Sequence, residues 1–366
     1  MTARRLFYDY YIFHSQRFGG VSRYFYELIS RAAMDPRFET SLFQGFFINQ
    51  YGIEKLHNRF ASHFGLRRPA IHQLRHLFKP VNQFLFERSF RKGRPEVYHQ
   101  THFLDLKPDY EGRRILTVYD MTHEVFSKNF PAGDQTKEQK KAAVKKADHI
   151  LAISESTKSD LVRLLGVAPE KVTVTLLANS LTHVGGASSL HTRPYFLFVG
   201  DRKGYKNFSL LLQAFSNSRA RAQMDLICYG GGPLSVQEES EIATKKLVGN
   251  VFWRQGPDQQ LATLYGHACA LVYPSLYEGF GLPILEAYHY GCPVVTSKTS
   301  SIPEVAGEAA LYFEKDQPED LARVLDQVAE DLALRARLAD RGREREKLFS
   351  WDRCYEQTAS VYMDGL

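Results

Sequence analysis

Two carboxylates lie eight residues apart in the stretch Tyr273–Gly291, which reads YPSLYEGFGLPILEAYHYG. Glu278 precedes a Gly-Phe-Gly loop, and Glu286 lies in the segment PILEAYHYG, which predicts a helix. Pro283 suits the first helical turn because its missing N–H would have no partner there, and Gly291 suits the helix end. We therefore expect Glu286 in the first turn of a helix, with Glu278 at the end of a strand across the loop.

The placement of these two acids on either side of a glycine loop suits a ligand that carries ribose, phosphate and a sugar. One carboxylate can accept hydrogen bonds from ribose hydroxyls, and the other can reach a sugar beyond it. Phosphate could be held by backbone amides of the loop, namely those of Gly279, Phe280, Gly281 and Leu282. The alternative is a helix-dipole acid beside a solvated loop acid, which explains either residue alone better than it explains the pair.

Two cations follow an earlier strand-like run, in the loop VGDRKGYKNF. Arg202 and Lys206 are four residues apart, so both can reach the mouth of the same loop. A guanidinium and an ammonium in that position can clamp a diphosphate. Solvated loop cations are the alternative interpretation, since most surface charges have no function.

A second glycine-rich loop near the start of the chain reads QRFGGVSRYFYEL. Gly19 and Gly20 precede a helical pattern there, and a helix N-terminus offers free N–H groups to an anion. A tight turn would also use two glycines, and neither loop is a GxGxxG or a GxxxxGK[ST] motif. The loop is therefore a weak indication of a ligand site.

The elements that must position these residues alternate along the chain. Short apolar runs rich in β-branched or aromatic residues include RRILTVYD, HILAIS, VTVTLL, YFLFVG, MDLICYG, ALVYPS and PVVTS. Helical periodicity marks segments between them, for example YKNFSLLLQAFSNSRA and PEDLARVLDQVAEDLALRARLADRG. Buried strands with intervening helices indicate doubly wound parallel sheets, which bind ligands at the carboxyl ends of their strands.

A Gly/Ser-rich segment without periodicity, Thr182–Pro194, is the predicted linker between two halves of similar size. We predict an N-terminal α/β domain over residues 1–184 and a C-terminal α/β domain over 185–349, followed by a separate helix over 350–366. The start of the chain, MTARRLFYDYYIF, is interpreted as a first strand rather than a signal peptide, because Asp9 interrupts its apolar run.

Bulk properties narrow the class of protein. No window approaches the ~18 continuous apolar residues of a membrane-spanning helix. The four scattered cysteines form no CxxC and no metal-ligand spacing, and they are typical of reduced core residues in a cytosolic protein. A cytoplasmic location is therefore expected.

Positive charge is concentrated in one segment, residues 67–94, interleaved with aromatic and aliphatic residues. Eight basic residues against the single acid Glu87 give it a net charge of +7: Arg67, Arg68, Arg75, Lys79, Arg88, Arg91, Lys92 and Arg94. Such a segment can lie on an anionic membrane surface or follow a nucleic-acid backbone. A solvated helix face with a buried aromatic stripe is the plainer interpretation.

These motifs together resemble a known family. YEGFGLPILEAYHYGCPVV resembles the E-x7-E signature of the family-four (group 1) retaining GT-B glycosyltransferases, and GDRKGYKNF resembles the phosphate-binding loop of that family. GGVSRY, ADHILAISESTKSDL, YGGGP, QGPDQQLATLY and SWDRCYEQTASVY are also similar to family segments. The resemblance covers most of the C-terminal half and scattered points of the N-terminal half.

The resemblance implies a fold and a set of roles. Two Rossmann-like domains would face a cleft that holds a nucleotide sugar, mostly on the C-terminal domain, and the helix after Trp351 would cross back onto the N-terminal domain. Arg202 and Lys206 would bind the diphosphate, Glu286 the ribose and Glu278 the transferred sugar, whose site the Gly279–Leu282 amides would line. Gly19 and Gly20 would approach the pyrophosphate from the other domain.

One position departs from the family pattern. Many members have a histidine at the end of the strand written here LTVYDMTH, where this chain has Tyr119 and Asp120. Asp120 is the candidate replacement in contact with the sugar. His99, His102 and His123, together with Tyr119, are candidates on the acceptor side, although a core or capping role is the ordinary one for each histidine.

The expected reaction is transfer of a sugar from a nucleoside diphosphate donor with retention at the anomeric carbon. Cations and amides would stabilise the leaving diphosphate, so no cofactor and no catalytic metal are expected, and the chain contains no DxD motif. The phosphate loop and the Tyr-Asp pair favour a GDP-mannose-type donor. The expected acceptor is a glycan or a lipid-linked glycan of bacterial surface polysaccharide or lipopolysaccharide synthesis, with the basic segment in peripheral contact with the inner face of the cytoplasmic membrane.

Two other functions remain open at this point. One is a different GT-B-type enzyme, such as a nucleotide-sugar epimerase or a sugar phosphorylase. The other is a non-catalytic membrane or nucleic-acid binder that uses residues 67–94, which would leave the E-x7-E loop unexplained. With glycosyl transfer as the preferred function, no nucleic-acid partner is expected.

Overall fold

The computed structural model describes residues 2–54, 61–67, 75–103, 110–181, 188–202 and 204–364. These residues form two compact units, each with its own parallel sheet. The first unit contains residues 1–125, 130–177 and 351–366, and the second contains 126–129 and 178–350. The second unit thus begins at Ala178, earlier than residue 185 from the composition, and residues 182–187 of the predicted linker lie outside the described residues.

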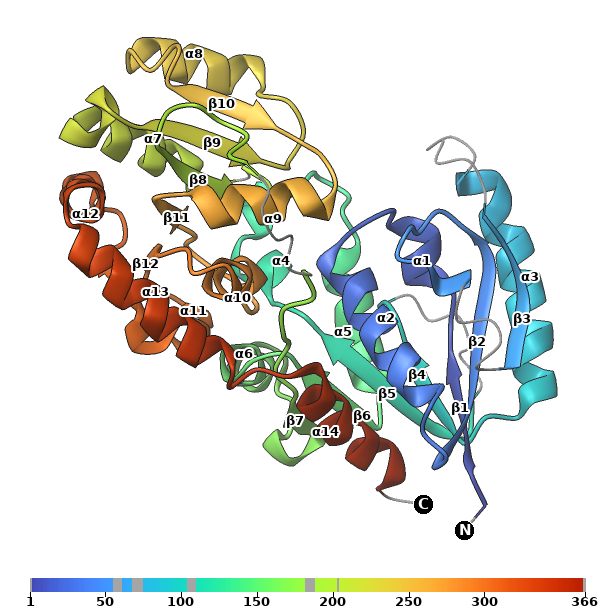
Figure 1. The fold of residues 1–366 in the computed structure, drawn as a ribbon. Helices are drawn as coiled ribbons and strands as arrows, with labels where there is room; N and C mark the ends of the chain where they lie inside the picture. Colours follow the sequence, from blue (N-terminus) through green and yellow to red (C-terminus); the bar gives the residue numbers. More distant parts are fainter. Residues whose placement is uncertain are drawn as a thin grey trace. The chain divides into compact units, whose positions relative to one another are not determined.

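The sheet of the first unit has seven parallel strands in the order β3-β2-β1-β4-β5-β6-β7. The strands are β1 (Arg4–Tyr8), β2 (Phe38–Phe47), β3 (Ala61–Arg67), β4 (Val97–Gln100), β5 (Arg113–Val118), β6 (His149–Ala152) and β7 (Val172–Val174). The helices are α1 (Tyr11–Ser15), α2 (Gly20–Ala32), α3 (Arg75–Gly93), α4 (Thr122–Val125), α5 (Thr136–Lys146), α6 (Glu155–Leu165) and α14 (Trp351–Met363), with the 3₁₀ turn η4 (Pro169–Lys171). Figure 1 shows α14 lying beside α2 in this unit.

The sheet of the second unit has six parallel strands in the order β10-β9-β8-β11-β12-β13. The strands are β8 (Tyr195–Val199), β9 (Asp225–Tyr229), β10 (Val251–Arg254), β11 (Ala270–Tyr273), β12 (Val294–Ser297) and β13 (Ala310–Phe313). The helices are α7 (Phe208–Asn217), α8 (Val236–Thr244), α9 (Asp258–His267), α10 (Leu282–His289), α11 (Ile302–Ala306), α12 (Pro318–Glu330) and α13 (Leu332–Glu346). The 3₁₀ turns are η3 (Ser127–Asn129), η5 (Gly204–Lys206), η6 (Arg219–Ala222) and η7 (Gly307–Ala309).

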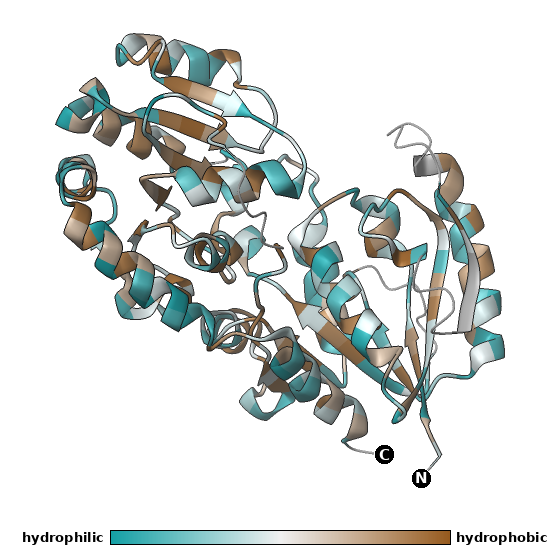
Figure 2. Ribbon diagram, viewed as in Figure 1, coloured by the Kyte–Doolittle hydropathy of each residue, from teal (hydrophilic) through white to brown (hydrophobic). Residues whose placement is uncertain are grey.

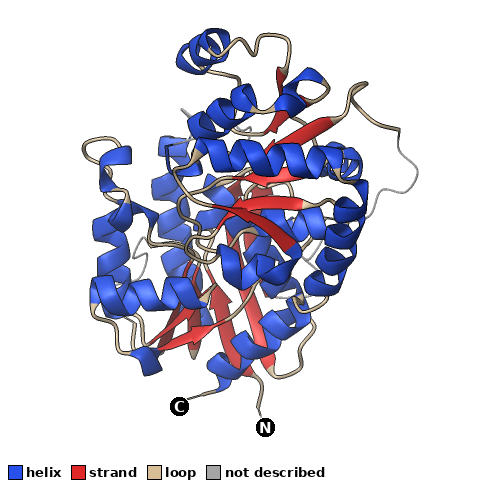
Figure 3. Cartoon of the chain, turned by 90° about the vertical axis from the view of Figure 1, so that its left-hand side faces the viewer, coloured by secondary structure: helices blue, strands red, loops and turns tan. Residues whose placement is uncertain are grey.

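Burial explains why the strands read as unbroken apolar runs. Helices cover both faces of each sheet (Figure 3), so side chains on either side of a strand are removed from water. Tyr195–Val199 and Asp225–Tyr229, for example, are buried at every position. Figure 2 shows the central strands mostly brown and the outer helix faces mostly teal. The predicted doubly wound parallel architecture is therefore confirmed.

The C-terminal helix belongs to the core of the first unit. The Tyr362 hydroxyl lies 2.9 Å from the Tyr8 hydroxyl on β1 and 2.6 Å from His99 Nδ1 on β4. The main-chain oxygen of Tyr362 accepts a 2.9 Å hydrogen bond from Arg4. At the other end of α14, Asp352 pairs with Arg31 of α2 at 2.8 Å. The expected return of the last helix to the N-terminal domain is thus confirmed.

Two segments differ from the sequence interpretation. MTARRLFYDYYIF is not one strand, because β1 ends at Tyr8 and the Asp9 carboxylate accepts a 2.9 Å hydrogen bond from the Tyr11 amide at the start of α1. The long helical pattern after Pro318 breaks at Asp331, which leaves helical geometry and caps α13 through the Leu334 amide at 2.7 Å. In both cases an aspartate competes for backbone N–H groups and sets an element boundary.

No helix among the described residues has the length and apolar character needed to span a membrane. The four cysteines are all buried and free, as their scattered apolar contexts predicted.

Candidate active site

The strand order of the second unit fixes where its loops meet. β8 lies between β9 and β11: the chain passes from β8 to β9 and β10 on one side, and then crosses from β10 to β11 on the other side of β8. This change of direction opens a crevice at the carboxyl ends of β8 and β11. The loop after β8 contains Lys206, and the loop after β11 contains Glu278. The topology therefore brings together two residues that are 72 positions apart in the sequence.

Lys206 and Glu278 form a two-pronged ion pair in this crevice. The Lys206 ammonium donates to both carboxylate oxygens of Glu278, at 2.7 and 2.9 Å. It also lies 5.5 and 5.4 Å from the ring centroids of Tyr205 and Tyr273. Both side chains of the ion pair are largely buried, and the Leu276 amide donates to the Tyr205 carbonyl at 2.8 Å, which ties the two loops together. Such an ammonium can exchange its carboxylate for another anion of similar reach, such as a phosphate.

Glu286 lies in the second turn of α10 and not, as predicted, in the first. The helix begins at Leu282 because Gly281, at φ 117° and ψ 45°, takes a conformation that a side chain would strain. Glu286 is half-buried, and its Oε2 atom accepts a 2.9 Å hydrogen bond from the Tyr265 hydroxyl of α9. The carboxylate is therefore held by a neighbouring helix rather than by amides of its own first turn.

The far end of α10 is fixed by a Schellman motif. Gly291, at φ 66°, donates to the Tyr288 carbonyl at 3.0 Å, and Cys292 donates to the Ala287 carbonyl at 2.8 Å. Gly342 of α13 packs on Tyr288 so closely that an added Cβ would lie 2.5 Å from the ring. These contacts leave α10 little freedom to rotate, and they fix the direction in which it presents Glu286.

A cluster of hydroxyls supports the loop that contains Glu278. Ser300 Oγ accepts from the Glu278 amide at 2.8 Å, and Ser301 Oγ lies 2.8 Å from the carbonyls of Glu278 and Phe280. Thr299 Oγ1 donates to the Ser275 carbonyl at 3.0 Å. The sequence analysis missed this support, although the run KTSS directly after the strand PVVTS was a visible signal.

Arg202 does not occupy the place expected of a diphosphate clamp. Its side chain is only 3% exposed, and Nε pairs with Glu238 Oε1 at 2.7 Å. The remaining nitrogens donate to the carbonyls of Gly230, Gly232 and Pro233, at 3.1, 2.8 and 2.9 Å. The guanidinium therefore holds the turn YGGGP and the start of α8, which leaves Lys206 as the cation beside Glu278.

The glycine turn that Arg202 holds could not be built from other residues. Gly230, Gly231 and Gly232 have φ values of 89°, 67° and 76°, a region that favours glycine. An added Cβ on Gly231 would lie 2.7 Å from the Gly200 carbonyl oxygen, so the turn rests directly on the loop after β8. The turn is thus part of the wall of the same crevice.

In the first unit, the double glycine begins α2. Gly20 is the first helical residue, and the Gly19 amide donates to the Tyr51 hydroxyl at 3.1 Å. The Arg23 guanidinium lies 4.7 Å from the Tyr51 ring centroid. Tyr51 follows the strand β2, and nothing in the sequence linked it to the glycine loop.

Asp120 follows β5, and its side chain is 38% exposed. Its Oδ1 atom accepts a 2.8 Å hydrogen bond from the Thr122 amide, and its carbonyl accepts from the buried Lys140 ammonium at 2.8 Å. Lys140 also pairs with Glu124 at 2.7 Å. Asp120 is therefore positioned by a buried ion pair while its carboxylate stays accessible.

The four acceptor-side candidates have unequal surroundings. His99 is fully buried, with Nδ1 on Tyr362 and Nε2 on Thr117, and burial lowers its pKa to about 3. This corrects the expectation for His99, which is a neutral core histidine. Burial raises the pKa of Tyr119 well above its usual value.

The other two histidines lie nearer the surface of the first unit. The His102 ring lies 4.7 Å from the Tyr11 ring, just after β4. The His123 ring stacks on Phe130 at 3.8 Å, and burial lowers its pKa. Neither arrangement assigns a chemical role to the histidine.

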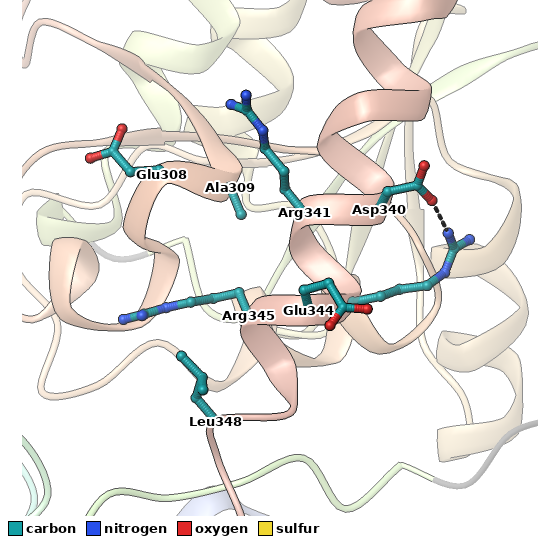
Figure 4. Close-up of a pocket in the computed structure, with 8 residues that line it drawn as sticks. Glu308, Ala309, Asp340, Arg341, Glu344, Arg345 and Leu348 are labelled. Carbon is teal, nitrogen blue, oxygen red and sulfur yellow. Dashed lines mark hydrogen bonds and ion pairs between the residues drawn. The ribbon is translucent and has the colours of Figure 1, made fainter.

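The described surface of the second unit also has a pocket of about 700 Å³ between η7 and α13 (Figure 4). Its lining includes Glu308, Arg341, Glu344 and Leu348, and none of the predicted site residues. Arg345 also lines this pocket, but its guanidinium donates to the carbonyls of Glu304 and Val305, at 2.6 and 3.1 Å. We therefore place the candidate site at the Lys206–Glu278 crevice.

Among the described residues, no group of three or more His, Cys, Asp or Glu side chains is arranged to hold a metal ion.

Replacing Arg202 by methionine tests its structural role. The change leaves Glu238 and three carbonyls without their donor, so we expect a loss of about 3 kcal/mol, or roughly 10 °C in melting temperature. The control is the same change at the exposed Arg221 on η6, which should melt with the wild type. A variant at Arg202 that melts normally and loses only nucleotide affinity would contradict the structural role.

Comparison with known proteins gives family matches in both halves of the chain. The model of the "Glycosyl transferases group 1" matches residues 187–345, and the model of "Glycosyltransferase Family 4" matches residues 18–175. O-antigen chain mannosyltransferase B of Escherichia coli is 30% identical over 94% of this chain and 95% of its own length. The MMP alpha-(1->4)-mannosyltransferase of Mycolicibacterium hassiacum is 28% identical over 62% of this chain and 56% of its own length.

Solved structures share the fold at low sequence identity. Sucrose-phosphate synthase from Thermosynechococcus elongatus superposes with a TM-score of 0.76 at 19% identity, over 98% of both chains. HepE of Anabaena, crystallised with UDP-glucose, superposes with a TM-score of 0.74 at 14% identity, over 99% of this chain and 100% of its own. The fold is therefore the GT-B fold, and the chain belongs to the group 1 (family 4) glycosyltransferases.

Proposed function

We propose that this glycosyltransferase moves mannose from GDP-mannose, with retention of anomeric configuration, to a glycan or lipid-linked acceptor of a cell-surface polysaccharide. The observation that carries the proposal is the meeting of Lys206, Glu278 and the Glu286 helix around one crevice of the second unit. The mannosyltransferase named for O-antigen chains, which matches nearly the whole chain, supports the sugar and the class of acceptor.

The proposal assigns a task to each candidate site residue of the crevice. Lys206 would leave Glu278 for the donor diphosphate and stabilise the charge that develops there as the anomeric bond breaks. Glu278, released from the ammonium, would accept hydrogen bonds from the sugar hydroxyls. Glu286 would bind the ribose, and the amides at the start of α10 would face the ligand.

The bond changes balance without a protein base. The bond between the anomeric carbon and the diphosphate oxygen breaks, and the acceptor oxygen bonds to the same carbon on the same face. The acceptor proton passes to the leaving diphosphate. With Lys206 as the cation, the proposal includes no catalytic metal, and Asp120, Gly19 and Gly20 remain its candidates for donor contact in the first unit.

The identity of the donor is the first test. Wild-type protein is screened by thermal shift with GDP, UDP, dTDP and ADP, and then with the corresponding sugar nucleotides. We expect GDP to give the largest rise in melting temperature and GDP-mannose to be consumed once acceptors are supplied, with no change on adding EDTA. A larger shift with another nucleoside diphosphate would contradict the GDP assignment, and donor conversion without any glycosylated product would favour an epimerase.

Because Lys206 and Glu278 pair with each other, we expect variants at these two positions to change the affinity for the nucleoside diphosphate in opposite directions. Lys206→Ala should weaken binding of the nucleoside diphosphate and lower turnover by about 10²–10³-fold, the usual cost of removing one charge-stabilising donor. Glu278→Gln removes the competitor for the ammonium, so binding of the free nucleoside diphosphate should tighten several-fold while turnover falls. Calorimetry and initial rates measure the two effects, and weaker binding in Glu278→Gln would refute the exchange of partners.

We also propose that α3 places the enzyme on an anionic membrane. Leu77, Val81 and Phe84 lie on one helix face and are 66%, 44% and 67% exposed, while Phe86 and Phe90 anchor the opposite face in an aromatic core. The same helix carries exposed basic side chains, of which Arg88, Arg91 and Lys92 lie on the side of this stripe and Lys79 on the other side. Apolar insertion with surrounding cations suits the headgroup region of anionic lipids. Of the segment named above, Arg68 lies outside the described residues, and Arg67 of β3 pairs with Glu54.

Vesicle flotation tests the membrane surface. Wild-type protein should float with phosphatidylglycerol vesicles at low salt, and the triple variant Arg88→Gln, Arg91→Gln and Lys92→Gln should lose most of this binding, at about 1 kcal/mol per charge. The matched control neutralises three exposed cations on and just after α13, namely Arg337, Arg341 and Lys347. Equal binding of both triple variants would show that α3 is not the contact.

A further inference from the structure

The Glu286 carboxylate of the crevice is held by a buried tyrosine. Tyr265 of α9 is fully buried, and its hydroxyl donates to Glu286 Oε2 at 2.9 Å. Glu286 belongs to α10, so this hydrogen bond joins two neighbouring helices at the crevice.

Burial keeps the Tyr265 hydroxyl protonated. It raises the pKa of Tyr265 well above its ordinary value, and the Glu286 charge acts in the same direction. The phenol therefore does not ionise near neutral pH, and its proton remains available to the carboxylate.

The Tyr265 ring cannot easily turn away from Glu286. It lies parallel to the Tyr290 ring, with 6.1 Å between centroids and 2° between planes. The neighbouring carbonyl of Leu264 accepts a 2.8 Å hydrogen bond from Tyr195, the first residue of β8, which fixes α9 to the sheet. The hydroxyl is thus fixed from two sides before any ligand arrives.

We propose that Tyr265 is a positioning residue for the nucleoside, which holds the Glu286 carboxylate in the one orientation that can receive ribose hydroxyls. A glutamate side chain has considerable rotamer freedom, and a ligand that must order it loses affinity. The buried hydroxyl removes that cost in advance. The inference rests on the proposed function, because it takes the ribose as the partner of Glu286.

The variant Tyr265→Phe removes the hydroxyl and keeps the ring against Tyr290. Calorimetry measures its Kd for whichever of GDP, UDP, dTDP and ADP most raises the melting temperature of the wild type. We expect the Kd to rise about tenfold, the size of one hydrogen bond to a charged group. The control is Tyr312→Phe on β13, which removes a tyrosine hydroxyl that donates to the Gly307 carbonyl at 2.7 Å and should leave the Kd unchanged.

A double-mutant cycle separates positioning from general loosening of the site. In the background of Glu286→Gln, Tyr265→Phe should raise the Kd less than twofold, because the carboxylate that Tyr265 positions is gone. A wild-type Kd in Tyr265→Phe, or the full tenfold loss in the Glu286→Gln background, would overturn the inference. If the wild type binds none of the four nucleotides, the proposed function fails first and takes the inference with it.

Discussion

All strands of each sheet run in the same direction, and most of the site follows from that constraint. Parallel pairing sends every strand-to-helix loop to one sheet edge, and the order β9-β8-β11 separates two of those loops around a crevice. Lys206 and Glu278 meet there because each lies shortly after its strand, not because of any closeness in sequence. Their ion pair in turn joins the two loops to each other. Residues that seem remote, such as Ser300 and Gly342, contribute by holding the loop or the helix in that arrangement.

The sequence was sufficient for the architecture and for the helices and strands that carry the candidate site residues. Strand runs such as YFLFVG and ALVYPS were recognisable because a strand covered on both faces must be apolar throughout. Pro283 and Gly291 marked α10 because their backbone preferences suit only its two ends. The exact start of that helix was not readable, since it depends on the left-handed conformation of Gly281 that the loop imposes. One residue of difference there moved Glu286 from the first turn to the second.

Side-chain contacts between segments that lie far apart in the sequence could not be predicted. Arg202 looked like a ligand clamp because a loop arginine carries no mark of whether its guanidinium faces solvent or carbonyl oxygens. His99 looked available for the same reason, although its ring lies between two hydroxyls in the core. The local sequence gives no signal for Tyr265, Tyr51 or the hydroxyls of residues 296–301. Their roles are visible only from their tertiary contacts. Side-chain direction, not residue type, separates structural from ligand-facing groups here.

The place of α14 has a consequence for how the protein is made. Its residues Tyr355 and Tyr362 complete the core of the first unit, yet the ribosome delivers them only after the whole second unit has emerged. Until then β1 and β4 lack the hydroxyl that bridges Tyr8 and His99, and the apolar face of α14 has not yet been supplied. The second unit does not depend on a later segment, because it consists of residues 178–350 and one short earlier segment. Synthesis in the N-to-C direction therefore lets the later half of the chain finish folding before the earlier half, the reverse of the usual vectorial order.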